Sequence, residues 1–186
     1  QQDILIGSPR AEQGHRHFKG VVGYFENPVP LRANLAGNPT FRDFHRQIHK
    51  MVWEAFDHED YPSHLLARQL RLKQDASHPP LYQAMFILQE QHQRNNISPF
   101  ILGQGGEGIE VDGLVRQAVG LDARMMIFVD LQLNIFEEQG ELTALWQYNS
   151  DLFYTETIER MGDNYRALLE EIVEAPEHRI STVPTM

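Results

Sequence analysis

The stretch MMIFVDLQLNIFEEQGELTALWQYN, residues 125–149, contains two segments in which apolar residues recur at every second position. This period is typical of a β-strand that buries one face. The Glu-Glu-Gln-Gly sequence between the segments, residues 137–140, is typical of a turn. The stretch therefore predicts an antiparallel hairpin. Its alternating apolar positions are Met125, Ile127, Val129, Leu131, Leu133 and Ile135, then Leu142, Ala144, Trp146 and Tyr148.

Two further segments predict strands outside this hairpin. Residues 81–88 are apolar on both alternations, as expected for a central strand buried on both faces. The apolar triplet Ile4-Leu-Ile6 has the composition of the end of a buried strand. Because the chain lacks an initial Met and opens almost directly into this triplet, we expect its start to be a cut edge.

Three segments carry apolar residues at helical spacing. One begins after Thr40, which with Asp43 supplies a plausible cap, and a short second one begins near Pro62. A third runs along the end of the chain and stops before Pro176. The apolar positions are Phe41, Phe44, Ile48, Val52 and Ala55; Leu65, Leu66 and Leu70; and Ile158, Met161, Tyr165, Leu168 and Ile172.

The order of these elements predicts an α/β fold in which a mixed β-sheet packs against helices. With 186 residues, the chain has the usual size of one domain, and 41% hydrophobic with 23% charged residues is ordinary for a folded protein. The least regular stretch, roughly 90–124, is long for a loop in a compact domain, and such loops are usually functional or mobile.

Composition argues against several classes of partner. The 16 basic and 26 acidic residues give a net charge of -10, which disfavours nucleic acid, because that affinity depends on clustered Lys and Arg. No stretch has the ~20 apolar residues of a membrane helix, and no leader is visible, so we expect no membrane contact and a cytoplasmic location. Without cysteine, the sequence excludes disulfides, thiolate nucleophiles and Cys-based zinc sites.

Two motifs match known sites only in part. Gly103, Gly105 and Gly108 satisfy G-x-G-x-x-G, but the following residues 109–111 have a strand composition, so no helix N-terminus would face a phosphate. His45 and His49 share one helix face and could chelate a metal if a third ligand converged. A solvated helix face explains these histidines without any ligand. We therefore expect a plain glycine loop and no metal site.

Other catalytic arrangements find no support in the sequence. No serine lies in a nucleophile-elbow context such as G-x-S-x-G, so a Ser-His-Asp triad finds no support. The paired carboxylates Asp57 with Asp60 and Glu137 with Glu138 lie in polar turns, which they most simply solvate. The residue patterns alone thus indicate a folded α/β domain without a catalytic set.

Four motifs in order resemble the condensation domains of nonribosomal peptide synthetases. Residues 6–9, Ile-Gly-Ser-Pro, resemble the start of I-G-T-P-x-A-G-R, and residues 23–32, GYFENPVPLR, resemble G-F-F-x-N-T-x-x-L-R. The alignment needs no gap between the two segments. Residues 57–62, DHEDYP, are similar to H-Q-D-x-P-F. Residues 75–86, DASHPPLYQAMF, are similar to R-D-x-S-R-x-P-L-F-Q-V-M-F, and residues 146–153, WQYNSDLF, to L-x-Y-N-T-D-L-F.

The resemblance implies the fold of chloramphenicol acetyltransferase, in which two α/β lobes enclose an active-site tunnel. It implies that residues 1–186 are the C-terminal subdomain, with a floor loop at about 9–20 and a latch to the other lobe at about 100–124. The family's catalytic motif H-H-x-x-x-D-G belongs to the N-terminal lobe and is absent from this sequence. We therefore expect no catalytic residue here, and no catalysis by this chain alone.

Four residues at motif positions are expected to support the tunnel. They are Ser8, Gln13, Asn27 and Gln83. Gln83 could face the tunnel with an amide that donates and accepts hydrogen bonds, or be an ordinary strand residue satisfied by its neighbours. Gln13 occupies the position of a family Arg, which is implied to pair with the Asp of the histidine motif. Either Arg10 or Arg16 replaces that contact, or the chain is an atypical, non-condensing member.

The resemblance implies that amide bonds form between acyl and aminoacyl thioesters held on carrier proteins. The implied partners are the N-terminal lobe of the same domain, acyl or peptidyl carrier proteins and neighbouring synthetase domains. No cofactor is expected to bind directly, since the phosphopantetheine arms of the carriers arrive as substrates. Two alternatives stay open: a non-catalytic scaffold that binds carrier proteins, suggested by Gln13, and a lobe of a heterocyclization or epimerization relative.

Overall fold

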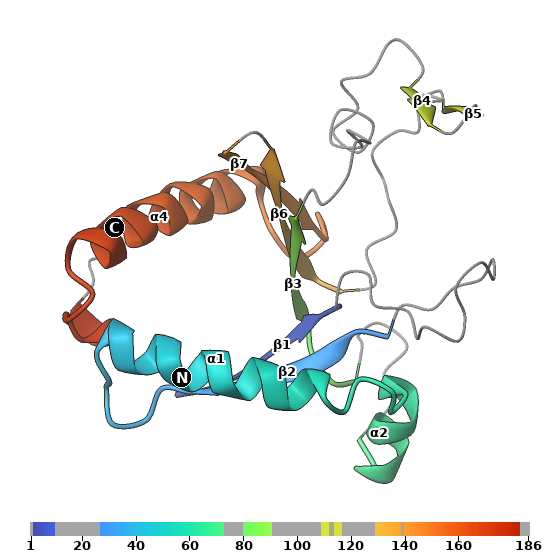
Figure 1. The fold of residues 1–186 in the computed structure, drawn as a ribbon, viewed down its shortest axis with the longest axis horizontal. Coiled ribbons are helices and arrows are strands. Elements are labelled where there is room, and N and C mark those ends of the chain that lie inside the picture. Colours follow the sequence, from blue (N-terminus) through green and yellow to red (C-terminus); the bar gives the residue numbers. More distant parts are fainter. Residues whose placement is uncertain are drawn as a thin grey trace.

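The computed structural model describes residues 2–9, 27–72, 80–90, 109–111, 114–116, 129–138 and 140–182. Figure 1 shows the arrangement of its helices and strands. In chain order they are β1 (Asp3–Ser8), β2 (Val29–Asn34), α1 (Phe41–Phe56), α2 (Ser63–Gln69), β3 (Ala84–Glu90), β4 (Ile109–Val111), β5 (Leu114–Arg116), β6 (Leu131–Glu138), β7 (Glu141–Tyr148), α4 (Thr155–Glu174) and the 3₁₀ turn η2 (Ile180–Thr182).

Five strands form one mixed sheet in the order β2-β1-β3-β6-β7. Strand β3 is parallel to both β1 and β6, whereas β1 with β2 and β6 with β7 are antiparallel pairs. Strands β4 and β5 form a separate two-stranded ribbon. The predicted α/β fold with a mixed sheet is confirmed.

The predicted hairpin is confirmed for β6 and β7. Glu138 pairs with Glu141, which leaves two residues for the turn, and Gly140 has φ +84°, the left-handed region that glycine adopts at little cost. The strand begins at Leu131, later than the apolar alternation predicts; Val129 lies in a bend before it and is buried. Residues 125–128 lie outside the described part of the chain.

Strand β2 was not predicted, because Pro28 and Pro30 argue against a strand. Among the strands that the structure describes, β2 lies at the edge of the sheet and pairs with β1 alone. A proline is tolerated there because its missing N–H need not reach a second neighbour. The sequence shows the prolines but not the position of the strand within the sheet.

The predicted central strand is confirmed as β3, with two differences. It begins at Ala84, so the described residues 81–83 precede it, and Leu88 is 43% exposed although the apolar pattern predicted burial on both faces. The triplet at residues 4–6 lies in the middle of β1 rather than at the end of a strand.

The pairing register divides the sheet into two faces. Leu133, Ile135 and Trp146 point to one side, and Gln132, Asn134 and Gln147 point to the other, because adjacent residues of a strand alternate. We call these the helix face and the amide face. Helix α4 packs on the helix face through Trp146, whose ring meets Tyr165 edge-on with centroids 6.0 Å apart. Burial raises the pKa of Tyr165.

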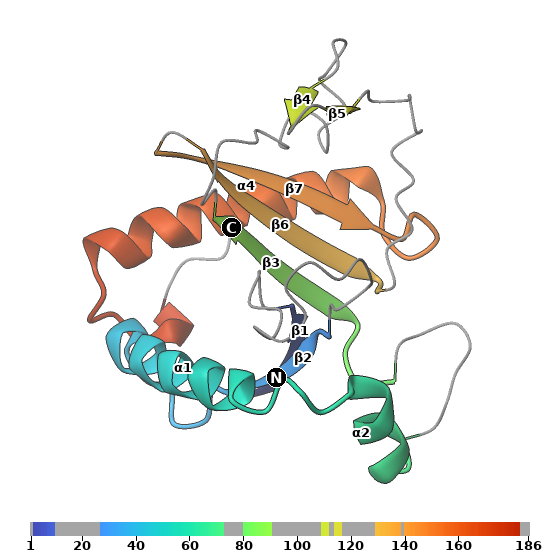
Figure 2. The ribbon, with the colours of Figure 1, turned by 45° about the vertical axis from the view of Figure 1, so that its right-hand side comes forward.

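Helix α1 covers the β2 end of the same face. It lies against β2 (Figure 1), whose Val29 is buried while Arg32 and Asn34, which point the other way, are exposed. Figure 2 shows α4 behind β6 and β7, and in Figure 1 both long helices lie on the left of β3 and β6. The amide face is therefore the side of the sheet away from α1 and α4.

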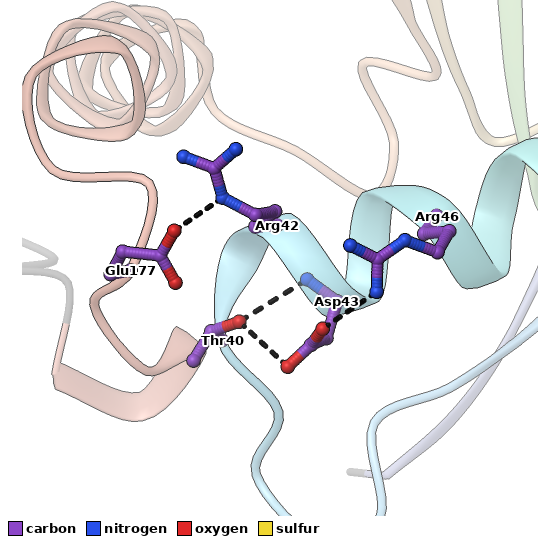
Figure 3. A network of polar contacts seen from close by, with 5 residues as sticks. All are labelled: Thr40, Arg42, Asp43, Arg46 and Glu177. Atoms are coloured by element: carbon purple, nitrogen blue, oxygen red, sulfur yellow. Dashed lines mark hydrogen bonds and ion pairs between the residues drawn. The ribbon is translucent and has the colours of Figure 1, made fainter.

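The predicted first helix and its cap are confirmed. The Thr40 hydroxyl accepts a hydrogen bond from the backbone N–H of Asp43, and Thr40 and Asp43 also contact through their side chains (Figure 3). Arg42 pairs with Glu177, which follows α4, and Asn38 bonds Ser181. These contacts tie the end of the described chain to the start of α1.

The other two helices are confirmed as well. Helix α2 begins after Pro62, and α4 ends one residue before Ala175-Pro176. Within the described ranges, none of the helices combines the length and the apolar composition that a membrane span requires. Strand β4 confirms the strand expected after the glycine cluster, but Gly103, Gly105 and Gly108 lie outside the described residues.

Candidate functional site

Three side-chain amides meet on the amide face of β6 and β7. Gln132 and Asn134 lie two residues apart on β6, and Gln147 lies opposite Gln132 on β7. Gln132 Nε2 donates to Asn134 Oδ1 at 3.1 Å and to Gln147 Oε1 at 3.2 Å. Asn134 Nδ2 donates to Gln147 Oε1 at 2.9 Å. We call these three residues the amide cluster.

The amide cluster is buried enough for its hydrogen bonds to matter. Asn134 is 5% exposed, and Gln132 and Gln147 are half-buried. A buried amide left without a partner costs about 1–3 kcal/mol, so the bonds within the cluster offset its desolvation. Phe136, next along this face, is 4% exposed. The cluster is thus a polar feature within a largely buried surface.

On the amide face, residues paired across neighbouring strands form a row, and this row is apolar on the side of β3 and β1. Met85 lies opposite Gln132, and Gly7 lies opposite Met85. A Cβ atom at Gly7 would lie 2.2 Å from Cε2 of Tyr82, so glycine leaves the space that this buried ring occupies. The row therefore runs from an aromatic ring at β1 to amides at β6 and β7. Such a surface suits a ligand with both apolar and amide parts.

Asn27, a predicted tunnel residue, joins β2 to the connection between α1 and α2. Its Nδ2 donates to the backbone carbonyls of Glu59 at 2.6 Å and Tyr61 at 2.9 Å. Its Oδ1 accepts from the backbone N–H of Ser63 at 3.1 Å. Both amide protons and the oxygen are engaged, so the geometry gives Asn27 a positioning role in the fold. Whether it also supports a tunnel stays a prediction.

Ser8 and Gln83 belong to the neighbouring strands β1 and β3 or their ends, but Ser8 is buried and Gln83 is exposed. Ser8 ends β1 opposite Val29, on the helix face, and is 8% exposed. Its hydroxyl donates to the adjacent Pro9 carbonyl at 3.5 Å. Gln83 immediately precedes β3 and is exposed, while its carbonyl accepts from the N–H groups of Asp130 and Leu131. Their contribution to a tunnel also stays a prediction.

The remaining predicted features lie mostly outside the described residues. Gln13 and most of the floor loop at 9–20 do so, and of the latch at 100–124 only β4 and β5 are described. The role of Gln13, which replaces a family Arg, therefore stays a sequence-based prediction.

His45 and His49 lie exposed on α1, as the helical spacing predicted. Their ring centroids are 6.5 Å apart, and Trp53 Nε1 donates to His49 Nε2 at 3.1 Å. Among the described residues, no three His, Cys, Asp or Glu side chains come together to hold a metal ion. The contact with Trp53 gives His49 a partner within the helix.

Sequence reasoning missed the amide cluster, although a signal was present. The predicted hairpin alternates apolar residues with Gln132, Asn134 and Gln147, which the alternation marks only as polar neighbours. A two-residue turn centred on Gln139-Gly140 would have paired Gln132 with Gln147 directly. The alternation shows which residues share a face; it does not show that this face is buried.

Comparisons with known proteins agree on one family. A family model described as "Condensation domain" matches residues 1–186. Tyrocidine synthase 3 of Brevibacillus parabrevis is 32% identical over 183 residues, a match that covers 98% of this chain and 3% of the relative. Gramicidin S synthase 2 of Brevibacillus brevis is 30% identical over 183 residues, covering 98% of this chain and 4% of the relative. The chain thus spans a small fraction of the curated relatives that it matches, which are large synthases.

Solved structures show the same fold. The X-domain from teicoplanin biosynthesis superposes with a TM-score of 0.78 at 22% identity, covering 100% of this chain and 40% of that chain. A four-domain nonribosomal peptide synthetase bound to AMP and glycine superposes with a TM-score of 0.73 at 23% identity, covering 97% of this chain and 14% of that chain. Together with the family match over its whole length, these findings confirm the resemblance read from the four motifs. The chain belongs to the condensation-domain family of nonribosomal peptide synthetases.

Proposed function

We propose that this chain is the C-terminal lobe of a condensation domain and that its amide face forms one wall of the reaction tunnel. The observation that carries the proposal is the division of the sheet. Helices α1 and α4 occupy one face, whereas the other bears the amide cluster with its buried Asn134, beside the buried Phe136. The match to about two fifths of the X-domain chain is consistent with one lobe of two.

In this proposal, the amine of an aminoacyl group attacks the thioester carbonyl of an upstream acyl or peptidyl group. A C–N bond forms, the C–S bond breaks, and the thiol of the upstream carrier arm leaves. The histidine that would assist the amine belongs to the H-H-x-x-x-D-G motif of the N-terminal lobe, which the family resemblance implies. This lobe would position the substrates, since binding energy spent on orientation lowers the barrier of a two-substrate reaction.

The proposed partners follow from this role. They are the N-terminal lobe, two carrier proteins with phosphopantetheine arms, and neighbouring synthetase domains; the large size of the related synthases supports the last of these. No cofactor is proposed beyond the carrier arms, which are substrates. A cytoplasmic location stays a prediction.

The test is a transfer assay with the full-length protein that contains this chain. One carrier is loaded with an acyl or peptidyl group and the other with an amino acid, and mass spectrometry follows the mass on the second carrier. A new amide on that carrier is expected. A thiazoline or oxazoline ring would instead support the heterocyclization alternative, and an inverted stereocentre the epimerization alternative.

A non-catalytic scaffold is the second candidate, and Gln13 favours it. An Arg at this position is implied to pair with the Asp of the histidine motif, and Gln offers a hydrogen bond without charge. The variant Gln13→Arg should raise the transfer rate if the lost ion pair limits catalysis. If neither the natural protein nor the variant transfers an acyl group, while loaded carriers still bind, the scaffold is correct and the amide-forming proposal is wrong.

A further inference from the structure

The hydrogen bonds within the amide cluster do not use all of its donors and acceptors. Gln147 Oε1 accepts two hydrogen bonds and Gln132 Nε2 donates two. This leaves the Gln132 carbonyl oxygen as an acceptor and the Gln147 amide NH₂ as a donor. Neither has a hydrogen-bond partner among the described residues, and both side chains are only half-buried. A donor and an acceptor thus remain available to a ligand.

The spacing of these two groups matches one residue of an extended peptide. Gln132 and Gln147 are directly opposite on neighbouring antiparallel strands, where Cβ atoms lie about 4.5–5.5 Å apart. In an extended chain, the N–H and C=O of one residue point to the same side, and an antiparallel neighbour binds both together. A residue lying over the cluster could donate its N–H to Gln132 and accept from Gln147.

The remainder of the row offers apolar contact to the same ligand. Met85 lies opposite Gln132, and the Tyr82 ring covers Gly7 beyond it. A peptide that crosses the row would place a backbone residue at the amides and a side chain on Met85. A simple acyl chain would gain the apolar contacts, but it has no N–H to donate to the half-buried Gln132.

We infer that the amide cluster recognises a peptidyl thioester, by binding the backbone N–H and C=O of one residue of the upstream chain. The inference rests on the proposed function and narrows its substrate class, since it favours an N-acylated aminoacyl or longer peptidyl donor over a plain acyl donor. Gln132 and Gln147 act as positioning residues, because they touch the substrate backbone away from the reacting carbonyl.

The experiment compares peptide donors with ester analogues in the full-length protein. Tripeptidyl donors are loaded on the upstream carrier with one amide at a time changed to an ester, which removes an N–H and keeps the chain length. At one position, the ester should lower the transfer rate by about two- to twelvefold relative to the amide, which is the effect of a lost hydrogen bond. The variant Gln132→Met should lose this discrimination, because it lacks the acceptor.

Two further variants separate recognition from folding. Gln147→Glu keeps an oxygen that accepts from Gln132 and Asn134, but it replaces the free NH₂ by a carboxylate oxygen that repels a substrate carbonyl. We expect it to weaken transfer of peptidyl donors while the melting temperature stays near that of the natural protein. Thr143→Val removes a polar group from the same face of β7, four residues from Gln147, and should leave the discrimination intact.

A binding measurement keeps the inference separate from the proposed function. Calorimetry with a tripeptidyl pantetheine thioether and its ester analogues requires no transfer chemistry. If transfer fails but the ester penalty appears in binding and is lost in Gln132→Met, the inference holds and the amide-forming proposal does not. If the natural protein shows no ester penalty at any position, or a folded Gln132→Met keeps it, the inference is wrong.

Discussion

At β6, both faces of the sheet contain buried side chains, but these side chains are apolar on the helix face and include a polar amide on the amide face. On the helix face, Leu133 and Ile135 are each 7% exposed and pack beneath helices, as apolar residues do at little cost. On the amide face, Asn134 is just as deeply buried, yet it keeps a polar side chain whose desolvation must be offset by hydrogen bonds. The polarity of Asn134 is therefore not a consequence of exposure.

This difference fits the proposal that the helix face stabilises the fold and the amide face binds a substrate. Apolar side chains of similar volume would satisfy burial on both faces, and replacing buried polar groups in this way is often neutral or stabilising. A polar network in a buried position thus has no evident advantage for stability. The proposed substrate recognition would give it one, because binding would then depend on a matching donor and acceptor.

The largest effect is expected from removing buried volume on the helix face. Leu133→Ala should destabilise the sheet by about 2–5 kcal/mol, as other buried leucines do. Hydrogen exchange of β6 and α4 amides, followed by mass spectrometry in the intact protein, should accelerate accordingly. Leu142→Ala is the matched control: the residue lies on the same face of β7 but is 67% exposed, so its replacement should change stability by less than about 0.5 kcal/mol.

Equal effects of the two leucine substitutions would contradict the assignment of the helix face as the stabilising layer. A large effect of Leu142→Ala alone would show that another part of the protein covers that side chain.

A smaller effect is expected where the amide face is tightly packed at β1. Gly7→Ala would place a methyl group 2.2 Å from the Tyr82 ring, so the ring has to move. Overpacking of this kind costs about 1–3 kcal/mol, which thermal melting would detect. In a Tyr82→Ala background, the same substitution should cost much less, because residues in contact do not contribute additively. An equal cost in both backgrounds would show that Tyr82 does not occupy this space.

Most of the fold could be predicted because each element depends on local sequence. The cap at Thr40, the apolar spacing of α1 and α4, and the alternation in β6 and β7 are all visible in short windows. Strand β2 was missed because a proline in a strand is tolerated only at a sheet edge, and the strand order is a long-range property.

The candidate site was harder to predict for the same reason. The motif position of Asn27 suggested a tunnel residue, but its three bonds to residues 59–63 depend on how the helices pack beside β2. The amide cluster requires both the register of the hairpin and the burial of its polar side. The first follows from the turn, whereas the second depends on segments distant in the sequence.

A stabilising substitution is expected at Gly162, in the helix that packs on the helix face. This glycine lies within α4, and an added Cβ would lie 3.6 Å from Trp146 Nε1, an ordinary contact distance. Gly162→Ala should therefore stabilise the protein by about 0.4–1 kcal/mol, by restricting the unfolded chain and favouring the helix. Melting temperature would report the gain. Gly37, with φ +82° and open space around it, is the control: alanine there should destabilise, because the backbone angle is strained.

The smallest effect is expected at the exposed end of the amide face, where Asp3 and Arg32 form an ion pair. Arg32 Nε donates to Asp3 Oδ1 at 2.9 Å, and Nη2 contacts Oδ2 at 2.8 Å. The hydrogen bond from Arg32 holds the pKa of the Asp3 carboxyl below its ordinary value. The pair thus contributes stability at pH values above the ordinary carboxyl pKa. This contribution is lost as the pH falls through the lowered pKa of Asp3.

Arg32→Gln should return the pKa of Asp3 toward its ordinary value, which carboxyl NMR of ¹³C-labelled aspartate would follow. Stability near neutral pH should change little, because both side chains are more than half exposed and solvent screens the pair. High salt should reduce even this small difference. A large loss of stability would instead show that the end of the amide face near β2 is covered in the intact protein, which would extend the buried polar surface from the amide cluster to the sheet edge.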